Sequence, residues 1–157
     1  MGVPQLSAAQ SNRLDEDAAR AGAAAALLAV GTQVRNTALD CSHFVNSLFE
    51  QVGLYYKYEP SRVLYHGTSA FRRVYRPLAG DLIVWPGHVG IVVDPEEQTF
   101  MSALRRGVRI SPYTSRYWRR KGSARFFRYR LPISDSAFAS QTSLSFDTQQ
   151  FDPSGMQ

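Results

Sequence analysis

Two short runs of β-forming residues, separated by a two-residue turn, constrain the fold of this chain most. Residues 82–85 read Leu-Ile-Val-Trp and residues 88–93 read His-Val-Gly-Ile-Val-Val, with Pro86-Gly87 between them. Pro and Gly at such a junction favour a tight turn, so the two runs predict a β-hairpin. Three later stretches also read as strands: residues 98–103, 108–111 and 125–131. The basic stretch between the last two, residues 113–121, reads as a helical or irregular loop.

Helical patterns occupy the part of the chain before the hairpin. Apolar residues between positions 44 and 52 recur at spacings of one, three and four, which predicts a helix over residues 42–51. Asp40 is a natural N-cap for it, and Gly53 is a natural stop. Helices followed by an antiparallel sheet predict an α+β fold with about five strands.

Further helices are expected on either side of this one. Residues 13–29 should form a helix capped by Ser11 or Asn12, with acidic residues in its first turn and Gly31 at its end. Residues 61–64 and 68–74 could form short helices. Residues 1–11 lack a pattern and are expected to be mobile.

The composition indicates one domain with a real core. The chain has 157 residues, 44% of them apolar. No apolar run reaches the roughly 18 residues that a membrane-spanning helix needs. A single cysteine excludes an internal disulfide and a cysteine-based metal cluster. Residues 132–157 are rich in Ser, Gln and Thr and are expected to be disordered.

The net charge of +5 is unevenly distributed. Residues 105–130 contain ten Arg or Lys residues and no acidic ones. We call this stretch the basic block. It would attract an anionic partner such as nucleic acid, acidic lipid or an acidic cell-wall polymer, or it could be a solvated rim.

The only cysteine, Cys41, lies at the start of the predicted helix over residues 42–51. Unpaired N–H groups and the positive end of the helix dipole favour a thiolate there, as a nucleophile requires. The alternative is a small, buried, inert cysteine. Of the histidines, His43 would project away from Cys41 around the helix, and His66 lies in an irregular segment. His88 begins a strand after a turn, where it could face the helix start or simply end the turn.

Three motifs occur in order and together resemble a known family. They read Asp40-Cys41-Ser42-x-Phe-Val, then Gly-Asp81-Leu-Ile-Val-Trp85, then His88-Val-Gly-Ile-Val-Val. In sequence and spacing this resembles the NlpC/P60 family, papain-like cysteine peptidases of bacterial cell walls. The resemblance covers about residues 31–131.

The resemblance implies a papain-like core in a single catalytic domain over residues 12–131. Cys41 would be the nucleophile and His88 the base, with Ser102 at the position of the family's third polar residue. Asp40, Ser42, His43 and Trp85 would lie in or beside the substrate cleft. The implied reaction is hydrolysis of the bond between γ-D-glutamate and a diamino acid in peptidoglycan stem peptides, without a metal or cofactor.

The same resemblance implies action outside the cytoplasm, in the periplasm, in the cell envelope or as a secreted protein, although no signal peptide is visible. The apolar stretch at residues 21–30 follows acidic residues, whereas a signal needs a basic flank. The implied partners are peptidoglycan peptides, with the basic block meeting an anionic wall polymer. Nucleic acid is not expected.

Three departures from the family pattern keep other functions open. Ser102 stands where the family usually has a histidine, and His43 stands where it has a glycine. No tyrosine occurs in residues 29–34, where the family places one near the active site. The alternatives are an acyltransferase or amidase acting on another substrate, and a catalytically weakened or silent homologue that binds the wall or a partner.

Overall fold

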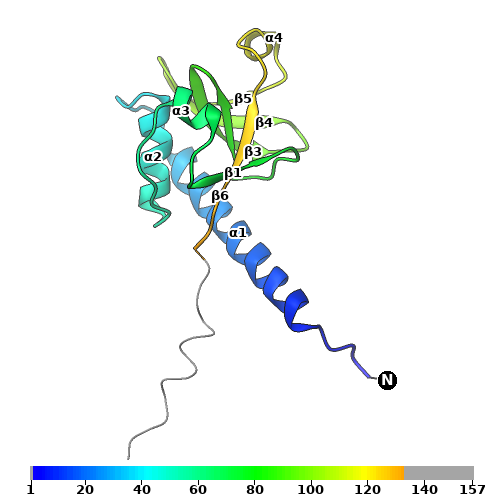
Figure 1. Ribbon diagram of the computed structural model, residues 1–157. Coiled ribbons are helices and arrows are strands. Elements are labelled where there is room, and N and C mark those ends of the chain that lie inside the picture. Colours follow the sequence, from blue (N-terminus) through cyan, green and yellow to red (C-terminus); the bar gives the residue numbers. More distant parts are fainter. Residues whose placement is uncertain (1, 133–157) are drawn as a thin grey trace, which may run out of the picture.

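Six antiparallel strands form one sheet in the order β1-β6-β2-β3-β4-β5 in this computed structural model, which describes residues 2–132 (Figure 1). The strands are β1 (Phe71–Val74), β2 (Leu82–Trp85), β3 (His88–Asp94), β4 (Thr99–Leu104), β5 (Gly107–Pro112) and β6 (Arg125–Tyr129). The helices are α1 (Ala8–Gln33), α2 (Cys41–Gln51), α3 (Ser61–His66) and α4 (Arg116–Arg119). The predicted α+β class is therefore confirmed.

The predicted hairpin is formed by β2 and β3, with Trp85 opposite His88 across the two-residue turn. β4 continues the antiparallel order beside β3 and pairs with β5. Gly90 of β3 makes the close packing with β4 possible. A Cβ atom there would lie 2.5 Å from a ring carbon of Phe100 and 2.5 Å from the carbonyl oxygen of Met101. No other residue fits this position without moving the neighbouring strand.

The sheet has one strand more than the sequence indicated. Residues 68–74 were predicted as a helix, but residues 71–74 form β1, so that prediction is wrong. β1 pairs only with β6, and Phe71 lies opposite Tyr129. The pairing joins segments more than fifty residues apart, which a local pattern cannot reveal.

α2 packs on the face of the sheet that carries Val89, Ile91 and Met101. The buried residues of α2 are the apolar ones that predicted the helix: Phe44, Val45, Leu48 and Phe49. Asp40 caps the helix as predicted, because its side chain accepts a hydrogen bond from the backbone N–H of His43 at 2.9 Å. Packing and cap together hold Cys41 at the first position of α2.

α1 is longer than predicted at both ends. Ser7 caps it in a capping box with Gln10, and the helix continues past Gly31 to Gln33. The expected caps Ser11 and Asn12 lie inside the helix, and its first turn contains no acidic residue. Residues 8–11 are therefore helical, contrary to the expectation for residues 1–11. Ala24, Leu27 and Gly31 are its buried residues, and its N-terminal part projects from the body of the protein (Figure 1).

A second, aromatic core lies on the sheet face opposite α2. Alternate residues of β2, β3 and β4 form it together with Trp118 of α4; its buried members are Ile83, Trp85, Val92, Phe100 and Trp118. α4 is thereby held against the end of the sheet at which β3 begins. Within residues 2–132, no helix is both long enough and apolar enough to cross a membrane. Of the tail predicted as disordered, residues 132–157, all but residue 132 lie outside the described part of the chain.

Candidate active site

The thiol of Cys41 lies beside the first residues of β3. Cys41 begins α2 and is half-buried. The backbone N–H of Val89 lies near the thiol and, with the N–H groups of Ser42 and of Cys41 itself, acts to lower the pKa of the thiol. Since Val89 directly follows His88, Cys41 lies near the start of β3, the strand that begins with His88.

The thiol is not the preformed thiolate that the helix start alone would favour. Burial raises the pKa of Cys41 above its usual value, the N–H of Val89 opposes this, and the negative charge of Asp40 raises the pKa further. The helix terminus does supply N–H groups that lower it, but loss of solvation outweighs them. The expectation of a thiolate in the free protein is therefore wrong, and Cys41 is a neutral thiol at neutral pH.

His88 is 9% exposed and makes one side-chain hydrogen bond. Its Nε2 lies 2.9 Å from Oγ of Ser102 on β4. With the proton on Nε2 donated to Ser102, Nδ1 carries the lone pair that can accept another proton. Burial lowers the pKa of His88 to about 4, with a further contribution from the positive charge of Lys121. The imidazole is therefore neutral at neutral pH, as a general base must be.

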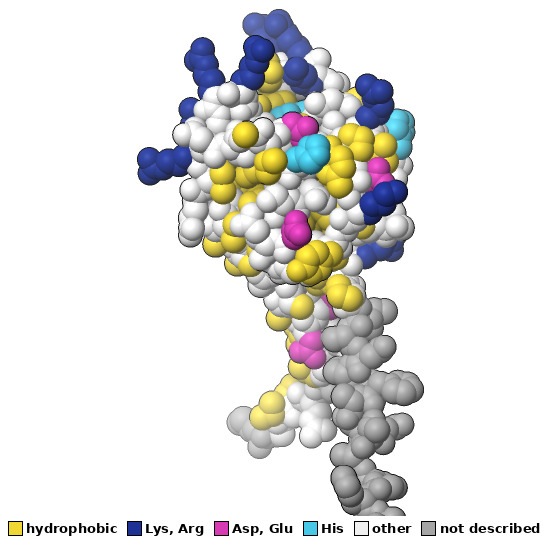
Figure 2. All heavy atoms as spheres, turned by 90° about the vertical axis from the view of Figure 1, so that its left-hand side faces the viewer, with side chains coloured by type: hydrophobic (Ala, Val, Ile, Leu, Met, Phe, Trp, Pro, Cys, Tyr) yellow, Lys and Arg dark blue, Asp and Glu magenta, His cyan; other side chains and the backbone are white. Residues whose placement is uncertain are grey.

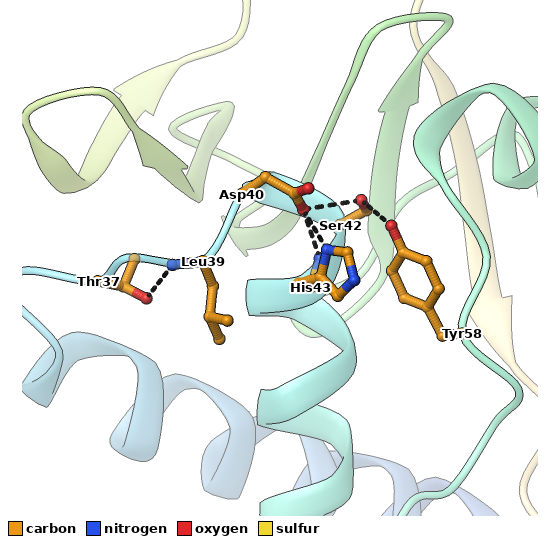
Figure 3. A network of polar contacts seen from close by, with 6 residues as sticks. All are labelled: Thr37, Leu39, Asp40, Ser42, His43 and Tyr58. Atoms are coloured by element: carbon orange, nitrogen blue, oxygen red, sulfur yellow. Dashed lines mark hydrogen bonds and ion pairs between the residues drawn. The ribbon is translucent and has the colours of Figure 1, made fainter.

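Asp40, Ser42, His43 and Tyr58 form a polar network at the start of α2 (Figure 3). Oδ1 of Asp40 lies 2.9 Å from Nδ1 of His43 and accepts a 3.0 Å hydrogen bond from Oγ of Ser42. Oγ of Ser42 also lies 3.0 Å from the hydroxyl of Tyr58. The rings of His43 and Tyr58 stack with their centroids 3.9 Å apart.

This network fixes the start of α2 and supplies polar groups at the rim of the site. The backbone N–H of His43 is the main group that lowers the pKa of Asp40, so the carboxylate stays charged. Sequence reasoning did not assign Tyr58 to the site. The Tyr58 side chain comes from the connection before α3, so no spacing relative to Cys41 could have indicated it.

Trp85 does not line an open cleft, contrary to expectation. Its side chain is 2% exposed and packs in the aromatic core, where its ring stacks on Trp118 at 4.8 Å. Trp118 was not predicted as a site residue, yet its ring centroid lies 4.6 Å from that of His88. The aromatic core is thus the wall behind the imidazole.

Part of the basic block lies next to this wall, because Arg116 and Arg119 belong to α4, the helix that carries Trp118. Eight of its ten basic residues are exposed: Arg105, Arg106, Arg109, Arg116, Arg119, Arg120, Lys121 and Arg130. Within residues 2–132, none of the eight forms an ion pair. Figure 2 shows Lys and Arg side chains gathered along the top of the molecule, at the height of α4 in Figure 1.

A separate groove of about 580 Å³ lies between the α1–α2 connection and β5. Its floor includes Met101 and Val108, and its rim includes Arg35 and Arg109. None of the predicted site residues lines it. In the described part of the chain, no group of three or more His, Cys, Asp or Glu residues is placed to hold a metal ion.

Comparison with known proteins agrees with the geometry. Among curated proteins, no relative matches the chain. The family model described as "NlpC/P60 family" matches residues 29–125, a span that begins in α1, includes Cys41, His88 and Ser102, and ends at the start of β6. The match covers more than half of the chain, and its core is the α+β arrangement just described, so the chain belongs to the NlpC/P60 family.

Proposed function

We propose that the protein is a cysteine peptidase that hydrolyses peptide bonds in peptidoglycan stem peptides. NlpC/P60 proteins are typically cysteine peptidases or amidases of the cell wall. Two observations support the proposal: the thiol at the start of α2 lies near Val89, the residue after His88, and the buried imidazole of His88 has its Nε2 2.9 Å from Oγ of Ser102. A nucleophile, its base and an orienting group are the minimum for acyl transfer.

Acylation begins from the neutral pair. Nδ1 of His88 accepts the proton of the Cys41 thiol as Sγ bonds to the carbonyl carbon of the substrate. The backbone N–H of Cys41, at the unpaired start of α2, donates to the oxyanion that develops. The C–N bond then breaks, the imidazolium of His88 gives its proton to the leaving amine, and a thioester on Cys41 remains.

Deacylation repeats the sequence with water. Nδ1 of His88 accepts a proton from water as the hydroxyl bonds to the thioester carbon. The C–S bond breaks, the thiolate regains the proton from His88, and the carboxylic acid leaves. His88 must therefore be neutral before each half-reaction, and the lowered pKa of His88 supports this.

Ser102 is the neutral orienting residue in this scheme. Its hydroxyl accepts the Nε2 proton and holds the tautomer in which Nδ1 is basic. It brings no charge to the imidazolium, unlike the carboxylate of a Ser-His-Asp triad. We assign the substrate as the bond between γ-D-glutamate and a diamino acid, which is the bond type that the family resemblance implies.

The test is digestion of purified peptidoglycan peptides followed by mass spectrometry of the products. The wild-type protein should release a fragment with a new amino group on the diamino acid. Cys41→Ala and His88→Gln should release none while keeping the fold by circular dichroism. His66→Gln, at an exposed histidine outside the site, should behave as wild type.

Two other outcomes would identify a different function. Cleavage of acyl esters by the wild-type protein, with wall peptides left intact, would show an acyltransferase or esterase. Binding to the wall that persists in Cys41→Ala, without any product from wild type, would show a silent binding protein. Either result would overturn the peptidase proposal.

We also propose that the exposed part of the basic block holds the enzyme on an anionic wall polymer, which implies action in the cell envelope or outside the cell. Eight exposed cations without acidic partners among residues 2–132 support this. Binding to insoluble wall material should weaken steeply with added salt and in Arg119→Glu/Arg120→Glu. Arg13→Glu/Arg20→Glu on α1 makes the same change in charge elsewhere. Binding to wall material that does not change with added salt, or that weakens equally in both variants, would refute this role.

A further inference from the structure

The indole of Trp118 faces the imidazole of His88 from the aromatic core. The two ring centroids are 4.6 Å apart and the ring planes differ by 30°. Trp118 is 3% exposed, and its other neighbours hold it in place: Trp85 stacks on it at 4.8 Å, and Phe100 meets it edge-on at 4.9 Å. The surface behind the imidazole is therefore rigid.

One hydrogen bond does not determine how an imidazole lies. The bond from Nε2 of His88 to Ser102 fixes one point of the ring but leaves rotation about that contact. A stacked indole removes this rotation, because tilting the imidazole would drive it into a packed ring. Together, the hydrogen bond and the indole set both the position of Nε2 and the plane in which Nδ1 points.

The positive charge of the imidazolium must also be stabilised within this site. Both half-reactions of the proposed mechanism protonate His88, which is buried and has a neutral partner in Ser102. The charged group that acts on it from a neighbouring element is Lys121 after α4, whose positive charge opposes protonation. The face of an indole carries partial negative charge and attracts a cation, most strongly where water is excluded.

We propose that Trp118 is a positioning residue for the general base: its indole fixes the plane of the His88 imidazole and stabilises the imidazolium that forms during catalysis. The proposal rests on the assignment of His88 as the base. It assigns to α4, the shortest helix of the described chain, a role in the chemistry in addition to its role in packing.

The test compares Trp118→Phe with Trp118→Leu. Phe and Leu are close in volume, so both variants open similar space behind His88, but only Phe offers an aromatic face. Tyr113→Leu is the control, because Tyr113 packs on Phe100 and Phe126 in the same core, and its ring is not among those that contact His88. Circular dichroism and thermal unfolding establish that each variant is folded.

The first readout is the titration of the His88 ring protons by NMR, which needs no substrate. The pKa of His88 should be higher in Trp118→Phe than in Trp118→Leu, and Tyr113→Leu should titrate as wild type. Equal titration in the Phe and Leu variants, or an equal change in Tyr113→Leu, would overturn the proposal.

The second readout is turnover of the wall peptide. kcat should be roughly tenfold lower in Trp118→Leu than in Trp118→Phe, with KM within about twofold, because the cation–π contact forms only with the protonated ring. A rise in KM with unchanged kcat would contradict the assignment, because it would show an effect on substrate binding alone. If the wild-type protein turns over no wall peptide, the proposed function fails in that arm alone, and the NMR comparison still decides the role of Trp118.

Discussion

Lowering the pH should destabilise the fold through one residue, His88. Its pKa in the folded protein is about 4, below the usual 6.5, because burial disfavours the charged ring. As the pH falls below about 6.5, His88 binds a proton in the unfolded chain but stays unprotonated in the folded protein. The stability contributed by the neutral, buried His88 is complete above this pH and is lost progressively down to a pH of about 4.

The size of the effect follows from the two pKa values. Each pKa unit between the folded and unfolded states corresponds to about 1.4 kcal/mol. The gap between 6.5 and about 4 therefore corresponds to a loss of about 3 kcal/mol in the free energy of unfolding. That is a large fraction of the total stability of an ordinary domain.

The assay is urea unfolding of the wild type and of His88→Gln at several pH values between about 7.5 and 3.5. Carboxylates titrate in both proteins, so the difference between their unfolding free energies isolates His88. His88→Gln should be less stable than wild type near neutral pH, and the gap should shrink by about 3 kcal/mol at the acid end. A gap that stays constant within about 0.5 kcal/mol would refute the reasoning. His66→Gln controls for the loss of one histidine as such.

Substitutions at Asp81, Gly90 and Ser102, with one control at Glu59, test the packing and the orienting contact. Asp81→Asn should cost about 3 to 5 kcal/mol in urea unfolding, because it leaves the guanidinium of Arg128, now held by two short hydrogen bonds, without its charged partner. Glu59→Gln, at a surface pair, should cost less than about 0.5 kcal/mol. Gly90→Ala should cost about 2 kcal/mol or more, since its methyl group would lie on Phe100 and the β4 backbone; a neutral result would contradict the packing. Ser102→Ala should lower kcat about tenfold with little change in KM, whereas Ser102→His should recover or raise it; unchanged kinetics in both would remove Ser102 from the mechanism.

Local patterns predicted the parts of the fold whose causes are local. The apolar spacing of α2, its Asp40 cap and the turn between β2 and β3 depend on neighbours within a few residues, and all three were correct. β1 was missed because its partner is β6. The predicted start of α1 is too late because Ser11 and Asn12, residue types that often cap helices, lie inside the helix, whereas Ser7 is the cap.

The candidate site, too, could be predicted from the sequence only in part. The three motifs contain Cys41 and His88, and the family resemblance added Ser102; the structure places Val89 near the thiol and Ser102 on the imidazole. The protonation state of Cys41 was predicted wrongly, because a helix terminus can be read from sequence whereas the solvation lost around the thiol cannot. Tyr58 and Trp118 reach the site from segments with no fixed spacing to the motifs.

The position of β6 has a consequence for how the protein is made. This strand, the last of the described chain, lies between β1 and β2 and is clamped to the hairpin side by Arg128 on Asp81. During synthesis α2 and the β2–β3 hairpin therefore emerge from the ribosome before the sheet can close. The core cannot be completed until residues 125–129 have been synthesised. Until then Cys41 belongs to an incompletely folded chain, and the late strand delays assembly of the sheet relative to synthesis of the proposed nucleophile.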